Sequence, residues 1–209
     1  MTVVHAPSAT ISADRITCRR GARVILSGLS FTAGPHDFIT FIGANGIGKS
    51  TLLRAMTGLG RITSGHLMVP AERCVFLGHR RGLKPELTAA ENLSFWLRCF
   101  GRPVSEKPSL PLGVERFLDR EIRHLSSGQA QRVALVSAML AGRPIWILDE
   151  PIAGLDRETS LEFAGLAETH CRAGGTVITT AHNTFSSDLC RYIDLTPYSP
   201  NMTESGHKR

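Results

Sequence analysis

The chain has 209 residues, of which 42% are hydrophobic and 20% are charged, and its formal net charge is +6. This composition is typical of a globular domain with a substantial core, and it excludes a disordered or low-complexity chain. The N-terminus lacks the basic start and apolar run of a signal peptide, and no stretch approaches the roughly 18 apolar residues of a membrane span, so neither is expected.

The charge pattern and the cysteines narrow the class of protein further. The basic residues are scattered without a long run, which suits work near phosphates or an anionic membrane surface, and no nucleic-acid partner is expected. The cysteines are odd in number, widely spaced and without a C-x-x-C pair, so we expect reduced thiols, mostly in the core, in a cytosolic protein. They are Cys18, Cys74, Cys99, Cys171 and Cys190.

The start of the chain predicts strands followed by a helix. Apolar residues between 9 and 31, with a turn at Arg20-Gly21, indicate an antiparallel β region packed beside the rest of the domain. Residues 37–42 indicate a short buried strand, and residues 52–56 belong to a helix that begins near Lys49.

The glycine-rich stretch between that strand and that helix fits G-x-x-x-x-G-K-[ST], the phosphate-binding loop. Its glycines let backbone N–H groups face inward as an anion-binding nest, and the following helix adds its positive dipole end. Lys49 is expected to reach the β- and γ-phosphates of a nucleotide, and the Ser50 hydroxyl to ligate Mg²⁺. A chance match is the alternative, and the flanking strand and helix argue against it. The expected nucleotide-binding residues here are Gly43, Ala44, Asn45, Gly46, Ile47, Gly48, Lys49, Ser50 and Thr51.

Two more strand signals follow this helix. A turn at residues 63–65 is expected to lead into a strand at residues 66–69. Residues 73–78 then indicate a clear strand, because they are almost entirely apolar.

The next segment is mainly helical. Thr88 and Glu91 form a capping box at the start of a helix that runs to about residue 100. A proline-rich loop follows, and then a short helix over about residues 114–120. A helical insert between two strands predicts a helical subdomain, over about residues 79–142, within one domain that spans the chain.

A second serine- and glycine-rich stretch, Leu125-Ser126-Ser127-Gly128-Gln129, begins a helix expected over residues 126–141. Backbone amides and the dipole at such a helix N-terminus can hold an anion. An ordinary helix cap is the alternative, since serine and glycine are common at helix starts.

An apolar strand then ends in two carboxylates. Residues 144–148 show no polar alternation, so this strand is expected to be covered on both faces, as central parallel strands are. Asp149 is expected to hold Mg²⁺, directly or through water, and Glu150 to polarise a water for attack on the γ-phosphate. Taken alone, two acids at a strand end are as compatible with caps and surface salt bridges.

The last elements complete an alternation of strands and helices. Residues 156–172 indicate a helix that Gly174-Gly175 ends, and residues 176–180 indicate the next strand. Alternating strands and helices predict an α/β layer fold with a parallel core sheet, to which the antiparallel β subdomain and the helical subdomain are added.

The three motifs, in their order along the chain, resemble those of ABC-type ATPases. The stretch at residues 125–129 is similar to the L-S-G-G-Q signature of that family, and it lies between the phosphate loop and Asp149-Glu150. The resemblance covers roughly residues 10–190 and implies the P-loop NTPase fold of ABC type, with ATP and Mg²⁺ as cofactors. Gly154-Leu155-Asp156 is similar to the D-loop, and His182 to the switch histidine that contacts the γ-phosphate, although a lone histidine at a strand end is often only a surface residue.

The resemblance further implies a homodimer in which two copies pair head to tail and share two ATP sites. In the family, the signature of one copy closes over the γ-phosphate held by the phosphate loop of the other. This assigns Ser126 a bond to the γ-phosphate, to which the Gly128 amide and the helix dipole add. Ser127, Gln129 and Asp156 are expected to belong to the same shared site.

Three departures from the family pattern affect the expected chemistry. His79 stands where the family normally has a glutamine that binds Mg²⁺ and the attacking water. A protonated histidine would repel Mg²⁺, so ATPase activity is expected to fall below about pH 6.5, where histidine gains a proton. Ser127 replaces the first glycine of L-S-G-G-Q, for which a modest effect is expected. No aromatic residue lies near Arg19 or Arg20 to stack on adenine, and an arginine plane is the alternative.

None of these departures removes Lys49, Asp149 or Glu150, so an active ATPase is expected with Glu150, His182 and His79 as its catalytic residues.

Within the family, residues 77–96 are similar to the same stretch in ATP-binding subunits of cytochrome c maturation transporters, the haem exporter ATPases. In that group a histidine at position 79 is expected. The resemblance places this segment against the coupling helices of a membrane subunit. Leu83, Lys84 and Glu86 are the expected docking contacts, while other apolar residues of the segment form core.

The resulting expectation is an ATPase that energises separate integral membrane permease subunits, located peripherally at the cytoplasmic face of the bacterial inner membrane. Its process would be cytochrome c biogenesis, through haem export or release of a haem chaperone. The chain lacks a coiled-coil insert and a second nucleotide-binding domain, which disfavours the repair and translation ABC proteins. The alternatives are the ATPase subunit of another exporter and a soluble ATP-gated switch.

Overall fold

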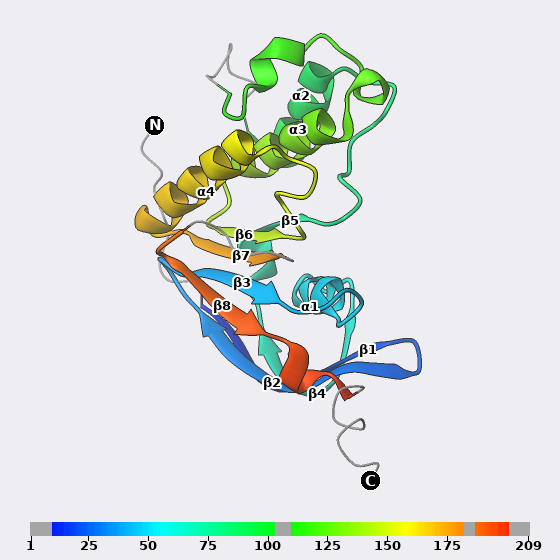
Figure 1. Ribbon diagram of the computed structural model, residues 1–209, viewed down its shortest axis with the longest axis vertical. Helices are drawn as coiled ribbons and strands as arrows, with labels where there is room; N and C mark the ends of the chain where they lie inside the picture. The colour runs from blue at the N-terminus through cyan, green and yellow to red at the C-terminus, as the bar shows by residue number, and fades with distance from the viewer. Residues whose placement is uncertain (1–9, 103–109, 182–186, 201–209) are drawn as a thin grey trace.

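The computed structural model describes residues 10–102, 110–181 and 187–200, which form two sheets and a set of helices (Figure 1). The parallel sheet contains, in spatial order, β5 Cys74–Leu77, β6 Ile145–Leu148, β7 Thr176–Thr180, β3 Phe38–Ile42 and β8 Cys190–Asp194. The antiparallel sheet contains β2 Arg23–Ala33, β1 Ile11–Arg20 and β4 Arg61–Met68. The α-helices are α1 Lys49–Met56, α2 Ala89–Cys99, α3 Ser127–Leu140 and α4 Arg157–Arg172, and short 3₁₀ turns lie at Ala71–Arg73, Val114–Phe117, Ile122–His124 and Thr196–Tyr198. The predicted fold class is therefore confirmed.

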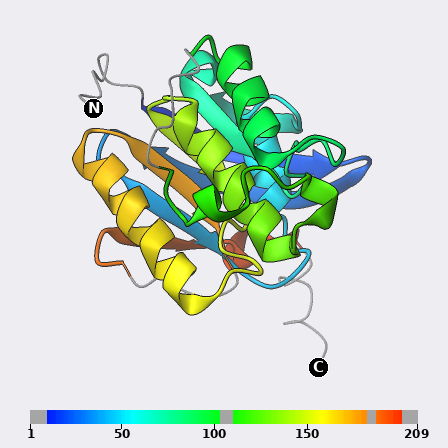
Figure 2. The same cartoon turned by 90° about the horizontal axis from the view of Figure 1, so that it is seen from above.

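Both faces of the parallel sheet are packed. Trp146 and Leu148 of β6 belong to the core under α2, α3 and α4, whereas Ile145 and Ile147 belong to the core shared with α1 and the antiparallel sheet. Figure 2 shows α3 and α4 crossing over one face of the sheet, and Figure 1 shows α1 on the other. Because successive residues of β6 enter different cores, every position of the strand must be apolar. The expectation that this strand is covered on both faces is confirmed.

The loops that follow the parallel strands gather at one edge of the sheet. The phosphate loop follows β3, Gly78-His79 follows β5, and Asp149 follows β6. The carboxyl ends of parallel strands share an edge, so these segments become neighbours although they are far apart in the sequence. The backbone links two of them directly, because the Asp149 N–H donates to the carbonyl of Leu77 at 2.7 Å.

Several local predictions were wrong. Residues 63–65 form no turn, because β4 runs through them as one strand. Gly65 is a glycine for a different reason: its φ is +81°, and a Cβ there would lie 2.5 Å from the carbonyl oxygen of Asp14 on β1. The short helix over residues 114–120 is a 3₁₀ turn that ends at Phe117. Strand β8, at the edge of the parallel sheet, was not predicted at all.

Other local predictions were confirmed. Thr88 and Glu91 form the capping box of α2: the Thr88 Oγ1 accepts from the Glu91 N–H at 3.2 Å, and the Glu91 Oε2 accepts from the Thr88 N–H at 2.8 Å. All five cysteines are free thiols, as expected, but the expectation that most of them lie in the core was wrong, because only Cys18 and Cys171 are buried. Within the described ranges, none of the helices has the length and apolar character that crossing a membrane requires.

Candidate active site

The phosphate loop lies between β3 and α1 and is shaped by its glycines. Gly43, Gly46 and Gly48 have φ values of +143°, +78° and +123°. A Cβ at Gly48 would lie 2.5 Å from the Cγ2 of Ile25 on β2. Gly48 is therefore required twice, by its backbone conformation and by the close approach of β2. The tip of the loop is exposed, as a loop that receives a ligand must be.

Lys49 sits at the start of α1 with its side chain buried to 5% exposure. Its Nζ donates to the carbonyl of Gly43 at 2.7 Å and to that of Ala44 at 3.4 Å, so the loop wraps the ammonium. Burial lowers the pKa of Lys49, and the nearby charges of Glu150 and Asp149 partly oppose this shift. Gly48 gives α1 no side-chain cap, which leaves the amides of the helix N-terminus for an anion. These features fit the triphosphate of a nucleotide.

Asp149 and Glu150 are held by one hydroxyl that the sequence did not single out. Thr180, at the end of β7, donates its hydroxyl to the Asp149 Oδ1 at 2.7 Å, and the Thr180 Oγ1 accepts from the Glu150 N–H at 2.9 Å. Thr180 is fully buried, and Asp149 is 6% exposed. Glu150 has a φ of +50°, a conformation that is rare outside glycine. Strain of this kind concentrates at functional sites, where the surrounding structure holds it in place.

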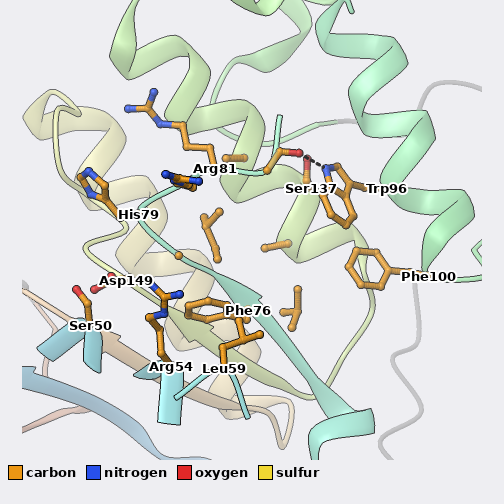
Figure 3. A pocket seen from close by; sticks show the side chains of 17 residues that line it. Ser50, Arg54, Leu59, Phe76, His79, Arg81, Trp96, Phe100, Ser137 and Asp149 are labelled. Atoms are coloured by element: carbon orange, nitrogen blue, oxygen red, sulfur yellow. Dashed lines mark hydrogen bonds between the residues drawn. The ribbon is translucent and has the colours of Figure 1, made fainter. Parts of the chain in front are cut away.

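A cavity of about 470 Å³ opens beside the phosphate loop (Figure 3). Ser50 from α1, His79 from the segment after β5, and Asp149 from the end of β6 all line it. At its other end the lining includes Trp96 of α2 and Phe100, the residue that directly follows this helix. The structure thus brings together three of the residues that the sequence assigned to the metal and the attacking water.

The residues present fit a magnesium ion. Ser50 and Asp149 offer a hydroxyl and a carboxylate, and Mg²⁺ prefers oxygen ligands, few of them from the protein and the rest from phosphates and water. In the parts of the chain that the structure describes, no three His, Cys, Asp or Glu side chains are grouped in a way that could hold a metal.

The signature stretch caps α3. Ser126 is the N-cap residue: its hydroxyl accepts from the Gln129 N–H at 3.2 Å, and the Gln129 side chain accepts from the Ser126 N–H at 3.0 Å. A Cβ at Gly128 would lie 2.7 Å from the carbonyl oxygen of Gly154, so only glycine fits against the D-loop here. The helix cap is therefore confirmed, and the role of these residues as an anion-binding signature stays a prediction.

Ser127 and Asp156 lie beside this cap. The Ser127 hydroxyl accepts a hydrogen bond from Arg81 at 2.8 Å. Asp156 is the N-cap of α4, and its carboxylate also pairs with Arg132 at 2.5 Å. Hydrogen bonds from the Thr159 backbone and side chain, and then the charge of Arg132, lower the pKa of Asp156.

The predicted residues thus form two groups within one chain. Ser50, His79 and Asp149 line the cavity, and Lys49 and Glu150 are close enough to interact electrostatically. The signature residues 126–129 do not contribute to the lining of that cavity. His182 lies outside the described residues.

A smaller cavity of about 160 Å³ lies on the other side of the phosphate loop. Arg20 and Arg23 of the β1–β2 hairpin line it together with Gly46, Ile47 and others. Arginine side chains therefore stand in the region where the sequence lacked an aromatic residue.

Sequence reasoning missed three residues of this region: Thr180, Arg81 and Gln131. The Arg81 Nε donates to the Gln131 Oε1 at 2.8 Å, and the Gln131 Nε2 donates to the carbonyl of Pro151 at 3.0 Å. Gln131 is 6% exposed, and a glutamine inside a helix that is otherwise apolar on that side was the available signal. Thr180 gave no signal, because threonine is common at strand ends.

Comparisons with known proteins agree with this geometry. The sequence profile described as "ABC transporter" matches residues 26–153. A protein named Cytochrome c biogenesis ATP-binding export protein CcmA from Cereibacter sphaeroides is 33% identical, over 90% of this chain and 90% of its own. The protein of the same name from Ruegeria pomeroyi is 36% identical, over 90% of this chain and 92% of its own.

A solved structure shows the same fold. It is titled the dimeric structure of a post-hydrolysis state of the ATP-binding cassette MJ0796 bound to ADP and Pi, and it aligns with a TM-score of 0.72 at 22% identity, over 88% of this chain and 96% of its own. The profile matches more than half of the chain and the curated relatives align over nine-tenths of it, so the chain belongs to the ABC transporter family, as one of its ATP-binding subunits.

Proposed function

We propose that this ATPase binds MgATP at the Lys49 loop, closes as a homodimer around two ATP molecules, and drives membrane subunits that serve cytochrome c biogenesis. The phosphate loop supports the first part, because its glycine conformations, its buried lysine and the uncapped start of α1 all favour a triphosphate. The curated relatives support the last part, because their shared name is that of a cytochrome c biogenesis export protein.

In the proposed site, residues 43–51 hold the triphosphate of ATP, with Lys49 on the β- and γ-phosphates. Ser50 and Asp149 hold Mg²⁺, which neutralises charge on the phosphate oxygens when it is bound. Thr180 fixes the Asp149 carboxylate through its hydroxyl, so the ligand keeps one orientation.

Glu150 acts as the base that polarises the attacking water, and Thr180 holds its backbone N–H. His79 lines the same cavity as Asp149 and is the proposed partner of the water and the metal in place of glutamine. His182 is the proposed contact to the γ-phosphate.

The signature completes the site only from a second copy. Residues Ser126, Ser127, Gly128 and Gln129 lie outside the lining of the cavity that Ser50 and Asp149 share, and the proposal assigns them to the γ-phosphate bound by a second copy. In a head-to-tail dimer they face the phosphate loop of the partner, and Asp156 lies at the same interface. The solved cassette of the same fold is described as dimeric, which supports this arrangement.

The smaller cavity is the proposed place of the adenine base. Arg20 and Arg23 border it beside the phosphate loop, and a planar guanidinium can stack on a base in place of an aromatic ring. A cavity bordered by arginines rather than an aromatic ring predicts weak selection between adenine and guanine.

The segment after β5 is the proposed docking surface for a membrane subunit. The side chain of Asn92, fully buried, accepts from the Lys84 N–H at 2.8 Å and donates to the carbonyls of Lys84, Leu87 and Thr88. The Trp96 Nε1 donates to the carbonyl of Gly82 at 3.1 Å. Helix α2 therefore holds this segment rigid while Lys84 and Glu86 stay exposed.

Leu83 is half-buried against the helical core, so its docking role is the smallest of the three. The helical subdomain at about residues 79–142 is the proposed unit that moves with the membrane subunit. Docking there places the protein peripherally at the cytoplasmic face of the inner membrane.

Sedimentation with MgATP tests the dimer and the site together. The Glu150→Gln variant is expected to bind ATP, hydrolyse it at least about 100-fold more slowly than wild type, and sediment as a dimer only when ATP is present. The Lys49→Ala variant is expected to stay a monomer, because it loses the contact to the phosphates. A Glu150→Gln protein that stays monomeric in saturating MgATP would contradict the shared site.

A further inference from the structure

One arginine joins three separate segments of this structure. The Arg81 Nε donates to the Gln131 Oε1 at 2.8 Å, and its Nη2 donates to the Ser127 Oγ at 2.8 Å. Ser127 and Gln131 are four residues apart on α3, so they lie on the same face of the helix and one planar guanidinium can hold both. Arg81 itself comes from the segment after β5, at the cavity shown in Figure 3.

Gln131 extends this connection to the turn at Glu150-Pro151, which we call the catalytic turn. Its Nε2 donates to the carbonyl of Pro151, the residue after Glu150, at 3.0 Å. The start of α3 is fixed there a second time, because Gly128 packs directly against the carbonyl of Gly154. The signature, the catalytic turn and Arg81 therefore form one hydrogen-bonded unit.

Ser127 supplies an acceptor that a glycine would not have. It stands at the position of the first glycine of L-S-G-G-Q, so the bond from Arg81 exists only because of the substitution in this chain. A hydrogen bond from a charged guanidinium is stronger than one between neutral groups. Ser127 and the arginine that meets it are therefore complementary.

We propose that Arg81 is a positioning residue: its paired bonds to Ser127 and Gln131 hold the signature in the orientation that closes over the γ-phosphate of a second copy. The chain directly after Arg81 is the segment that α2 holds rigid through Asn92 and Trp96. A partner that displaces this segment moves Arg81, and the signature moves with it. This inference rests on the proposed shared site.

If Arg81 positions the signature, breaking its bonds should weaken the ATP-dependent dimer. The dissociation constant of that dimer is measured by sedimentation in the Glu150→Gln background. Ser127→Ala removes the acceptor alone, and we expect the dimer to weaken about 5- to 10-fold. Ser127→Thr retains a hydroxyl and is the matched control, so its dimer is expected to stay within about twofold of the background. The affinity of each monomer for a fluorescent ATP analogue is expected not to change, because the phosphate loop lies elsewhere.

Arg81 variants separate positioning from simple charge. Arg81→Lys retains the positive charge but loses the planar fork, so we expect it to weaken the dimer as much as Arg81→Gln does. The combination of Arg81→Gln with Ser127→Ala is expected to weaken the dimer no more than Arg81→Gln alone, since both substitutions break the same bond. A lysine variant that dimerises like the background, or two single effects that multiply, would overturn the proposal.

Hydrogen exchange of the nucleotide-free monomer tests the positioning without a dimer. Amides of residues 126–131 are expected to exchange faster in Arg81→Gln and in Ser127→Ala than in the background, and at the background rate in Ser127→Thr. Equal exchange in all four proteins would overturn the role of Arg81. The expected exchange differences among the variants, together with a background protein that never dimerises in ATP, would instead contradict the proposed function.

Discussion

At the scale of single residues, the site depends on one buried hydroxyl. Thr180 donates to the Asp149 carboxylate and accepts from the Glu150 N–H, so it holds the side chain of Asp149 and the backbone of Glu150. The left-handed conformation of Glu150 needs such an external restraint, because the conformation is unfavourable for a residue with a Cβ.

Replacing Thr180 tests this dependence. Thr180→Val keeps the shape but removes the hydroxyl, and we expect a loss of about 1–3 kcal/mol in the free energy of unfolding and a fall of about 10- to 100-fold in kcat. Thr180→Ser, which retains the hydroxyl, is expected to remain within about threefold of wild type. Chemical denaturation and steady-state ATPase assays measure the two quantities, and a valine variant with the wild-type kcat would contradict the role.

We expect His79 to give the ATPase activity a pH dependence that a glutamine at this position would not give. A proton on this imidazole would place a cation beside the proposed Mg²⁺ ligands, and such a cation disfavours the metal. ATPase activity of the wild type is therefore expected to fall as the pH drops from 8 to 6, whereas His79→Gln is expected to stay nearly flat. A variant that shows the same fall as the wild type would rule out His79 as the cause.

At the scale of elements, two glycines in helices have opposite roles. Gly128 of α3 packs against the carbonyl of Gly154, and a Cβ at Gly128 would lie only 2.7 Å from that carbonyl oxygen. Gly165 lies exposed inside α4, and a Cβ there would meet nothing within 4 Å. The first glycine is required by packing, and the second only makes the helix less stable.

Alanine substitutions at these two positions are a matched pair. Gly128→Ala is expected to lower the free energy of unfolding by about 1–3 kcal/mol and to impair ATP-dependent dimerisation, because the signature and the D-loop must separate. Gly165→Ala is expected to raise the free energy of unfolding by about 1 kcal/mol and to leave dimerisation unchanged. Thermal unfolding and sedimentation check both, and a Gly128→Ala protein as stable as wild type would show that the contact is not tight.

The elements also show what the sequence could predict. The phosphate loop was predictable because each of its glycines is needed by the backbone itself, and β6 because both of its faces are buried. Strand β8 was not, because it is an edge strand without a buried residue, and such a strand carries little apolar signal. Gly65 indicates a turn when the sequence alone is considered, but a glycine is also needed inside a strand where the neighbouring strand approaches closely.

The same limit applies to the site. Lys49, Asp149 and Glu150 stand in local motifs, and the sequence placed them correctly at the edge of the sheet. Thr180, Arg81 and Gln131 act through contacts between segments that lie about 30 to 50 residues apart, and no local pattern encodes such contacts.

At the scale of the whole molecule, the proposed dimer requires each chain to carry two halves of a shared site. One half is the phosphate loop with the cavity of Ser50, His79 and Asp149, and the other is the signature on α3, which lies outside that cavity. Arg81 stands between the second half and the segment proposed to meet a membrane subunit. Closure of two copies around ATP would therefore move the docking segment, which is how hydrolysis can perform work on a partner.

The central claim is that this work is done on a membrane protein, and co-purification tests it most directly. The tagged Glu150→Gln protein is captured from detergent-solubilised membranes in MgATP, beside the same protein with Lys84→Ala and Glu86→Ala added, and integral membrane proteins are identified by mass spectrometry. We expect the Glu150→Gln protein to retain a defined membrane subunit, and the added substitutions at the exposed docking residues to reduce its recovery. Recovery of a pure soluble dimer, with no integral membrane protein, would contradict the transporter assignment and leave an ATP-gated switch.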